Sequence, residues 1–475
     1  MYLNIQKEIG SSLIKQIYEQ VRSMIIKGEL KAHERLSSTR EMAINLNVSR
    51  NTVITAYEML IAEGYIKSVP GSGIFISQGA EFAKPPERII DYSVTAFSAK
   101  ELSEDIIGFH SGTPALDLFP RNKWSRIAGQ VIKEAPDSAF GYDYPQGRPE
   151  LRNTLAAYLK KTRGINICPE QIIVTTGAKQ GLSLVAKLLL QPGSEALIED
   201  PSNENVKKIF LFHTDRITPI EADSEGIRPE LFPQDRSPAL VFVTPSHQFP
   251  LGGVLSIQRR LDLIRYAGKT GCYIVEDDYD SEFRYRGLPI SSLQELDNER
   301  VIYIGTFSKT LFPSVRLGYI VLPDSLVEQC SELKRLMDHH TNSLNQLTLM
   351  RFIENGELER HIRRMKKIYR KRRNSLIECI NEYFPGKVRI MGETAGMHIV
   401  AEFTDVEFSP KLMKSIEGVG LKIFPVEEHA VIKGKHRHQI ILGYAHLNNT
   451  DIRNGILRLK EVLDLWNEKG AYCVY

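Results

Sequence analysis

Cysteine is scarce in this chain of 475 residues: there are five, Cys168, Cys272, Cys330, Cys379 and Cys473. Their number is odd, and no two of them form a Cys-x-x-Cys pair. The scarcity and the scatter exclude a disulfide framework and a cysteine-based zinc site of the usual spacing. We therefore expect the protein to work in a reducing compartment, the cytoplasm.

Long apolar runs and an excess of one charge are also missing. No apolar stretch approaches the roughly 20 residues that a membrane helix needs, and the start "MYLNIQKEIG" lacks a signal-peptide pattern. The 61 Lys and Arg against 58 Asp and Glu give a net charge of +3, so bulk charge does not predict a nucleic-acid partner. A soluble protein without a membrane partner is expected, and its length predicts two or three domains.

Residues 11–79 form a self-contained pattern. Leu13, Ile17, Val21 and Ile25 recur at helical spacing. Farther on, Ser38 and Glu41 form a capping box before "TREMAINL", and Ser49 can cap a third helix that ends near Glu63. "YIKSVPGSGIFIS" then predicts two short strands joined by a turn at residues 70–73. This order is that of a winged helix-turn-helix, and a generic three-helix domain with a hairpin is the alternative.

Polar residues at two helix starts favour the DNA-binding interpretation. Arg40, Arg50, Asn51 and Thr52 lie in the first turns of consecutive helices, where side chains can reach phosphates and base edges. Residues 1–79 hold nine Lys or Arg and seven Glu, so binding would depend on the placement of charges more than on their number.

The stretch "LSSTREMAINLNVSRNTVITAYEMLIAEGYIKSVPGSGIFIS" resembles the winged-helix domain of the GntR family of bacterial regulators, through its STRE, VSRNTV and GSG motifs. The resemblance implies binding to double-stranded promoter DNA. The DNA-contacting residues that we predict are Ser38, Thr39, Arg40, Ser49, Arg50, Asn51, Thr52, Tyr57, Gly71, Ser72 and Gly73.

Residues 80–105 contain Pro-Pro, several charges and no sustained periodicity, which predicts a linker. From residue 106 onward, strand-like runs such as "QIIVTT", "ALVFVTP" and "VIYIGT" alternate with helix-length segments. That alternation predicts an α/β domain with a mostly parallel sheet.

Lys309 follows the apolar run "VIYIG" and the hydroxyl residues Thr306 and Ser308, so it is placed where a strand gives way to a loop. A single lysine is usually a solvated surface charge. A lysine that forms a Schiff base needs a sheltered site and a lowered pKa, which a neighbouring cation such as Arg316 helps to supply.

A second strand ends in Asp277, Asp278 and Tyr279, within "YIVEDDYDSEF". One carboxylate could pair with a pyridinium nitrogen, and the phenol could donate to a ring oxygen. A metal site is the competing interpretation of clustered carboxylates. No matching second acidic cluster is present, so we predict no metal.

Two loops complete the pattern. "VTTGAKQGLSLVAKLLL" runs from a strand through Gly177 into a helix, whose N-terminus suits a phosphate. "TPSHQFPLGG" follows the strand "LVFV" and could bring His247 or Gln248 to a ring face or edge.

In this order the motifs resemble the class I/II aminotransferases of fold type I, which use pyridoxal 5'-phosphate (PLP), over residues 106–465. That resemblance implies a large parallel-sheet domain and a smaller C-terminal α+β domain. It makes Lys309 the Schiff-base lysine, Asp277 the partner of the pyridinium with Asp278 as the less favoured choice, and Tyr279 the partner of the ring oxygen. The other cofactor-binding residues that we predict are Ala178, Lys179, Thr306, Ser308, Arg316 and Gln248, with Tyr142 reaching the phosphate from a neighbouring subunit of a homodimer.

The fusion of the two halves resembles the MocR/GabR subfamily of GntR regulators. The resemblance implies a PLP-dependent transcriptional regulator in which an amine or amino-acid effector, or PLP itself, is sensed at Lys309 and alters promoter binding. A true aminotransferase with an accessory DNA-binding head is the alternative, with residual half-reactions possible in the sensor. A DNA-binding module on a cofactor-free scaffold is disfavoured because Lys309, Asp277 and Tyr279 are all present.

Two departures from the family pattern concern the effector, for which we predict contacts with Gly112, Asn203 and His446. Asn203 stands where a tyrosine is common, and His446 stands where relatives often place a carboxylate-binding arginine. Because histidine lacks the permanent charge and the fork of arginine, an α-amino acid would be held less firmly. His446 as an ordinary pocket residue is the alternative.

The stretch "HIRRMKKIYRKRRNSL", residues 361–376, is heavily basic, but it carries an apolar stripe at Ile362, Met365, Tyr369 and Leu376. A helix with a solvated charged face is the prediction. A contact with the DNA backbone is the alternative role.

Overall fold

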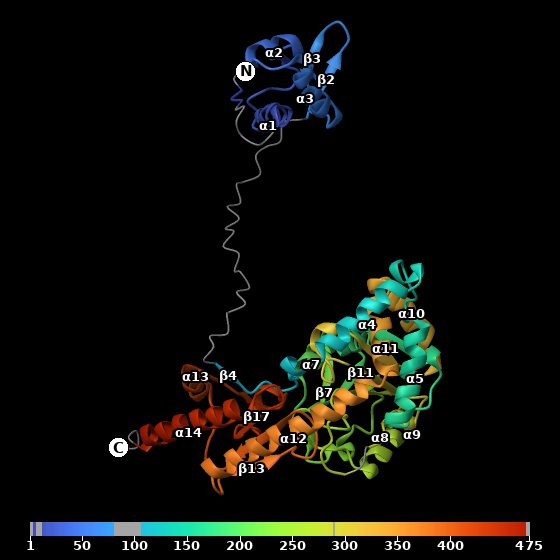
Figure 1. Ribbon diagram of the computed structural model, residues 1–475, viewed down its shortest axis with the longest axis vertical. Coiled ribbons are helices and arrows are strands. Elements are labelled where there is room, and N and C mark those ends of the chain that lie inside the picture. The colour runs from blue at the N-terminus through green and yellow to red at the C-terminus, as the bar shows by residue number, and fades with distance from the viewer. Residues whose placement is uncertain (1–2, 6–11, 80–105, 288–289, 472–475) are drawn as a thin grey trace. The chain divides into compact units, whose positions relative to one another are not determined.

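A computed structural model describes residues 3–5, 12–79, 106–287 and 290–471 of the chain. The chain divides into two compact units, residues 1–101 and 102–475, called here the head and the body. Each is described by itself (Figure 1). The predicted linker, residues 80–105, lies outside the described residues.

The head has the predicted order of helices and strands. Its helices are α1 (Leu13–Ile26), α2 (Thr39–Leu46) and α3 (Arg50–Ala62). Its antiparallel sheet has the order β1 (Arg35–Leu36), β3 (Gly73–Ile76), β2 (Ile66–Val69). Ser38 and Ser49 cap α2 and α3, since each hydroxyl accepts a hydrogen bond from the backbone N–H three residues on, at 3.2 and 3.1 Å.

Tyr57 belongs to the core of the head, which corrects the prediction that it contacts DNA. Its side chain is 1% exposed, and its hydroxyl donates to the carbonyl of Ser37 at 3.1 Å. It is buried with Val53, Ala56 and Leu60 on the inner face of α3. A phenol in that position fixes the loop before α2 and is not available to DNA.

The body is built on an eight-stranded sheet within the described residues. In sheet order the strands are β5 (Ile172–Thr175), β12 (Gly318–Val321), β11 (Val301–Thr306), β10 (Tyr273–Asp278), β9 (Leu240–Val243), β6 (Glu195–Asp200), β7 (Arg216–Asp223) and β8 (Gly226–Ile227). β11, β10, β9, β6 and β7 run parallel, while β12 and β8 are antiparallel to their neighbours. The mostly parallel sheet matches the prediction, and because parallel strands end at one edge, the loops after β9, β10 and β11 come together there.

Helices cover both faces of this sheet (Figure 1). One apolar cluster joins β5, β11 and β12 to α4 (Arg121–Glu134), α5 (Pro149–Arg163) and α11 (Ser343–Glu354). A second cluster joins the sheet to α6 (Ala178–Leu189), α7 (Glu204–Leu211) and α10 (Asp324–Asp338). α8 (Ile257–Thr270) and α9 (Leu293–Leu296) pack in a third cluster.

The C-terminal part forms the smaller α+β domain that the resemblance implied. Its sheet has the order β13 (Val388–Met391), β14 (His398–Phe403), β17 (Gln439–Gly443), β16 (Phe424–Pro425). β15 (Leu421–Lys422) pairs in parallel with β4 (Ile107–Gly108). The helices are α12 (Glu357–Tyr383), α13 (Pro410–Gly418) and α14 (Asn449–Ala471).

α12 contains the basic stretch, and its apolar stripe is confirmed: Met365, Tyr369 and Leu376 are buried. Not every charge on it is solvated. Arg373 is buried over the ring of Tyr285, with 4.7 Å between its Cζ and the ring centroid. Among the described residues, no helix is long and apolar enough to cross a membrane.

Candidate functional site

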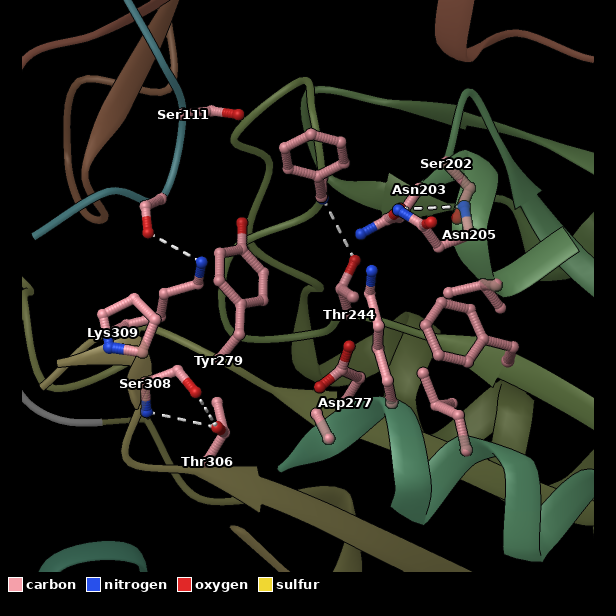
Figure 2. Close-up of a pocket in the computed structure, with 18 of the residues that line it drawn as sticks. Ser111, Ser202, Asn203, Asn205, Thr244, Asp277, Tyr279, Thr306, Ser308 and Lys309 are labelled. Carbon is pink, nitrogen blue, oxygen red and sulfur yellow. Dashed lines mark hydrogen bonds between the residues drawn. The ribbon is translucent and has the colours of Figure 1, made fainter. Parts of the chain in front are cut away.

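A cavity of about 300 Å³ opens at the edge of the sheet where the parallel strands end (Figure 2). Ten of the predicted residues line it: Lys309, Asp277, Tyr279, Ala178, Lys179, Thr306, Ser308, Arg316, Gly112 and Asn203. They come from the ends of β10 and β11, the start of α6 and two loops. The structure thus brings together segments that are separated by up to 204 positions in the chain (316 − 112).

Lys309 projects into the cavity alongside Tyr279 and Asp277 (Figure 2). Its Nζ donates to the carbonyl oxygen of Gly112 at 2.7 Å. Burial lowers the pKa of Lys309, against the opposing effect of Asp280 and Asp277. A lowered pKa raises the fraction of neutral amine, which is the form that attacks a carbonyl carbon.

Gly112 is needed at this contact. Its φ is +70°, and a Cβ built there would lie 2.8 Å from Nζ of Lys309. Any side chain would therefore displace the lysine from the position it holds.

The two adjacent carboxylates have different roles. Asp277 lines the cavity, and its Oδ1 is shielded from solvent with no hydrogen-bond partner. Asp278 turns away and forms an ion pair with Arg163 at 2.8 Å, while the hydroxyl of Tyr303 donates to it at 2.6 Å. Asp277 is therefore the carboxylate free to meet a cationic ring nitrogen.

Tyr279 belongs to a buried hydrogen-bonded chain. Its hydroxyl lies 3.0 Å from Nδ1 of His247, which is 3.1 Å from a carboxylate oxygen of Asp280. Burial raises the pKa of Tyr279 well above its usual value, so the phenol keeps its proton and can donate it.

His398 also lines the cavity, and with His247 and Asp280 it forms the one group within the described residues that could hold a metal ion. Each of the three side chains already makes a hydrogen bond, although Nε2 of His247 and Oδ1 of Asp280 have no partner among the described residues. Nε2 of His398 lies 2.9 Å from the carbonyl oxygen of Pro250, and Nδ1 of His247 is bound as above. Burial, followed by the neighbouring His247, lowers the pKa of His398 to about 3, which keeps its ring uncharged.

Part of the cavity lining suits a phosphate. Gly177 caps α6 with a φ of +110°, and a Cβ there would lie 3.3 Å from a guanidinium nitrogen of Arg316. The hydroxyls of Thr306 and Ser308 lie 3.1 Å apart beside it. A helix N-terminus, two hydroxyls and the side chains of Lys179 and Arg316 supply donors and positive charge to an anion.

Three predicted residues lie outside the cavity lining. Gln248 is fully buried, and its amide donates to the carbonyl oxygens of Pro201 and Phe249, both at 2.8 Å. It fastens two loops behind the cavity, which corrects its prediction as a contact of the cofactor ring.

Nε2 of His446 lies 2.8 Å from the carbonyl oxygen of Gly108, and the residue does not line the cavity. Tyr142 is 87% exposed at the surface of the body.

Sequence reasoning missed several lining residues: Ser111, Ser202, Asn205, Thr244, Phe249 and His398. Most of them are close in sequence to a recognised motif. The sequence signal that could have identified them is their position after a buried strand. His398 had none, because it begins β14, in the smaller domain.

Asp277→Asn is expected to stabilise the cofactor-free protein at high pH. Burial, followed by Asp278, raises the pKa of Asp277 to about 7, whereas an unfolded aspartate ionises near pH 4. Between these values the native state binds more protons than the unfolded state, so the stability from this group falls as pH rises. Urea unfolding should show a gain on the order of 2 kcal/mol at pH 8 and little change at pH 4. The exposed Asp405→Asn is the control, and an equal or lower stability of Asp277→Asn at pH 8 would contradict this assignment.

The predicted DNA-contacting surface is on the head. Thr39 and Arg40 begin α2, Arg50 and Asn51 begin α3, and the turn between β2 and β3 contains Gly71 and Ser72. Arg40, Arg50, Asn51, Gly71 and Ser72 are exposed, and within the described part of the chain neither arginine forms an ion pair. Gly73 has a φ of +121°, and a Cβ there would lie 2.9 Å from Nε of Arg35.

Two family models match the chain. The model of aminotransferase class I and II matches residues 104–441, and that of the gntR family of bacterial regulatory proteins matches residues 13–76. The first matches most of the body and the second most of the head.

Two named regulatory proteins match the chain over most of its length. The chain is 34% identical to the probable rhizopine catabolism regulatory protein MocR of Rhizobium meliloti, over 99% of this chain and 97% of that protein. It is 30% identical to the pyridoxine biosynthesis transcriptional regulator PdxR of Corynebacterium glutamicum, over 82% and 83%. Among solved structures, the α-aminoadipate aminotransferase LysN of Thermus thermophilus, complexed with N-(5'-phosphopyridoxyl)-L-leucine, is 28% identical with a TM-score of 0.69. That match covers 78% of this chain and 95% of LysN. The chain belongs to the MocR/GabR subfamily of GntR-type transcriptional regulators, with a fold type I aminotransferase-like body.

Proposed function

We propose that the protein is a PLP-dependent transcriptional regulator that senses a primary amine, or PLP itself, at Lys309 and changes its affinity for promoter DNA. One observation carries the proposal: a buried lysine amine and an unpartnered carboxylate share one cavity in a chain with a helix-turn-helix head. The identity of the relatives as regulators supports a sensing role.

The residues of the cavity fit PLP by their chemistry. When bound, the cofactor would supply an aldehyde that condenses with amines and a pyridinium ring that withdraws electrons. Asp277 would hold the ring nitrogen, since its Oδ1 is shielded and without a partner. Ala178, Lys179, Thr306, Ser308 and Arg316 would hold the phosphate.

The remaining polar groups position and protect the reacting amine. Asp280 orients His247, and His247 orients the phenol of Tyr279, which can donate a proton to the ring oxygen. The carbonyl oxygen of Gly112 accepts a hydrogen bond from the free amine of Lys309 and would hold that amine in the cavity whenever it is not bonded to the cofactor. Asn203, at the N-cap of α7, lines the cavity and would contact the effector.

A homodimer is part of the proposal. Tyr142 is 87% exposed, and the flanking Phe140 and Tyr144 are each 58% exposed. Exposed aromatic side chains gathered in one segment are typical of a surface that another protein covers. We expect this segment to cover the cavity of a second copy, with Tyr142 reaching its phosphate.

DNA binding under controlled ligation tests the proposal. The full-length protein is titrated with a labelled duplex from upstream of its own gene, without cofactor, with PLP, and with PLP plus a panel of primary amines and amino acids. We expect at least one of these additions to change the dissociation constant about 5-fold or more, which corresponds to a coupling of about 1 kcal/mol. The change should be lost in Lys309→Ala. A dissociation constant that stays the same under every condition would contradict sensing.

A true aminotransferase is the second candidate, and the likeness of the body to LysN over 95% of that enzyme favours it. A steady-state turnover measurement distinguishes the sensor from the enzyme. Many cycles with an amino donor and a keto acid would establish an enzyme, whereas a sensor should stop after a single half-reaction.

A further inference from the structure

The body contains a second cavity, of about 1010 Å³, between α5, α11, α12 and the segment after β10. Of the described residues, none lines both this cavity and the one that contains Lys309. No motif in the sequence pointed to it, and neither cofactor chemistry nor DNA binding uses it.

Two cations face this cavity without a carboxylate partner among the described residues. Nε and Nη1 of Arg284 are shielded from solvent, and neither forms a hydrogen bond. Lys366 lies at the rim on α12, where burial and the charges of Arg370 and Arg284 lower its pKa. Buried guanidinium donors that are left unpaired are costly, because they lose water and gain nothing in exchange.

Arg163 adds a third donor. Its side chain is 7% exposed and pairs with Asp278 through Nη2 at 2.8 Å. Its Nε has no partner, although the residue lines the cavity. A ligand in this cavity would therefore contact the residue that holds Asp278, the neighbour of Asp277.

Most of the other charges around the cavity have a partner, but the carboxylate of Glu354 forms no ion pair within the described residues and accepts a hydrogen bond from the hydroxyl of Thr154 at 3.0 Å. Glu359 pairs with Lys161 at 3.1 Å and with Arg363 at 3.0 Å, and Glu150 pairs with Arg148 at 2.9 Å. Glu282 accepts from the hydroxyl of Tyr158 at 3.4 Å, and burial raises its pKa to about 7. Five cationic and four acidic side chains line the cavity, so one positive charge is in excess, and among the described residues Arg284 and Lys366 are the lining cations without an ion pair.

Apolar side chains also line the cavity. Met350 and Ile353 of α11 and Leu358 and Ile362 of α12 line it. A mainly apolar lining with a few unpaired donors beside it is the arrangement of a ligand pocket with few polar anchors.

We propose that this cavity binds a small organic acid, with its carboxylate at Arg284 and Lys366 and its apolar body against α11 and α12. Coulombic attraction and charge-assisted hydrogen bonds would hold the carboxylate. Burial of the alkyl or aryl part would add roughly 0.8 kcal/mol for each methylene. The site is distinct from Lys309 and does not depend on PLP.

Displacement of a fluorescent anion tests this site. The full-length protein is titrated with 8-anilinonaphthalene-1-sulfonate, which is then displaced by decanoate below its micellar concentration and, in parallel, by the uncharged decanol. We expect decanoate to displace the probe at least 10-fold more effectively than decanol. The same result should be obtained with Lys309→Ala, so a failure of the cofactor proposal would leave this test intact.

Matched variants locate the site. Arg284→Gln and Lys366→Gln are each expected to weaken decanoate about 10-fold, whereas the exposed Arg286→Gln and Lys367→Gln should leave it unchanged. If circular dichroism shows that Arg284→Gln is unfolded, the test relies on Lys366→Gln, whose side chain lies at the rim. Three outcomes would each overturn the proposal. Decanoate and decanol could displace the probe equally well, or the folded variants could keep the decanoate affinity of the unaltered protein. Decanoate could also fail to bind because a second copy of the chain fills the cavity.

Discussion

Lys309→Ala is expected to remove all covalent attachment of PLP and the visible absorbance of the bound cofactor. The Nζ atom of Lys309 is the amine that faces Asp277 and the carbonyl oxygen of Gly112 inside the cavity. Without it the aldehyde has no protein amine to condense with at that place. The phosphate contacts would remain, so we expect weak, non-covalent retention of the cofactor, reduced by about 100-fold or more in affinity.

The measurement is borohydride reduction followed by peptide mass spectrometry, together with an absorbance titration with PLP. Lys187→Ala is the matched control, since Lys187 is an exposed lysine near the end of α6. The control should give full labelling of the peptide that contains Lys309. Labelling of Lys309→Ala at a stoichiometry near that of the control would show that another lysine serves, and this assignment would be lost.

The sequence predicted the parts of the site that rest on local chemistry. Lys309, Asp277 and Gly177 each lie where a buried strand ends, and the ends of parallel strands share one edge of a sheet. The choice between Asp277 and Asp278 was open, because successive side chains of a strand point to opposite faces. In the structure Asp278 pairs with Arg163, from a helix 115 positions earlier in the chain (278 − 163), which supports the proposal of Asp277 as the partner of the ring nitrogen. No local pattern predicts such a pair.

The errors have a common physical origin. Tyr57 and Gln248 were assigned to function because they stand inside functional motifs, yet both are buried and hydrogen-bonded to nearby backbone. For Tyr57 the signal was present: Val53, Ala56, Tyr57 and Leu60 recur at helical spacing on the inner face of α3. For Gln248 there was none, because its partner Pro201 lies on another strand end. The second cavity was equally invisible, since four separate segments assemble it.

Arg50→Ala is expected to weaken binding to the specific promoter duplex by about 10- to 100-fold. Arg50 is exposed at the first turn of α3, the second helix of the helix-turn-helix, and it has no ion-pair partner among the described residues. Residues in that turn reach base edges or phosphates, and the loss of one such contact costs about 1–3 kcal/mol. If Arg50 reads a base, Arg50→Ala should bind the specific and a scrambled duplex with nearly equal affinity. If it contacts a phosphate, the affinities for both duplexes should fall together. The slope of the logarithm of the binding constant against the logarithm of the salt concentration should then correspond to about one released ion fewer.

Fluorescence anisotropy at several salt concentrations distinguishes these outcomes, with both duplexes and with Asn51→Ala in parallel. Lys15→Ala is the control, because Lys15 is an exposed lysine of the same head whose nearest carboxylate is Glu19 at 3.7 Å, on α1. Removing that charge should change the affinity less than about 2-fold, because the lysine lies on a helix outside the predicted reading surface. An Arg50→Ala protein that binds the specific duplex as tightly as Lys15→Ala does would refute the assignment of Arg50 to the DNA-contacting surface, even if the cofactor cavity behaves as proposed.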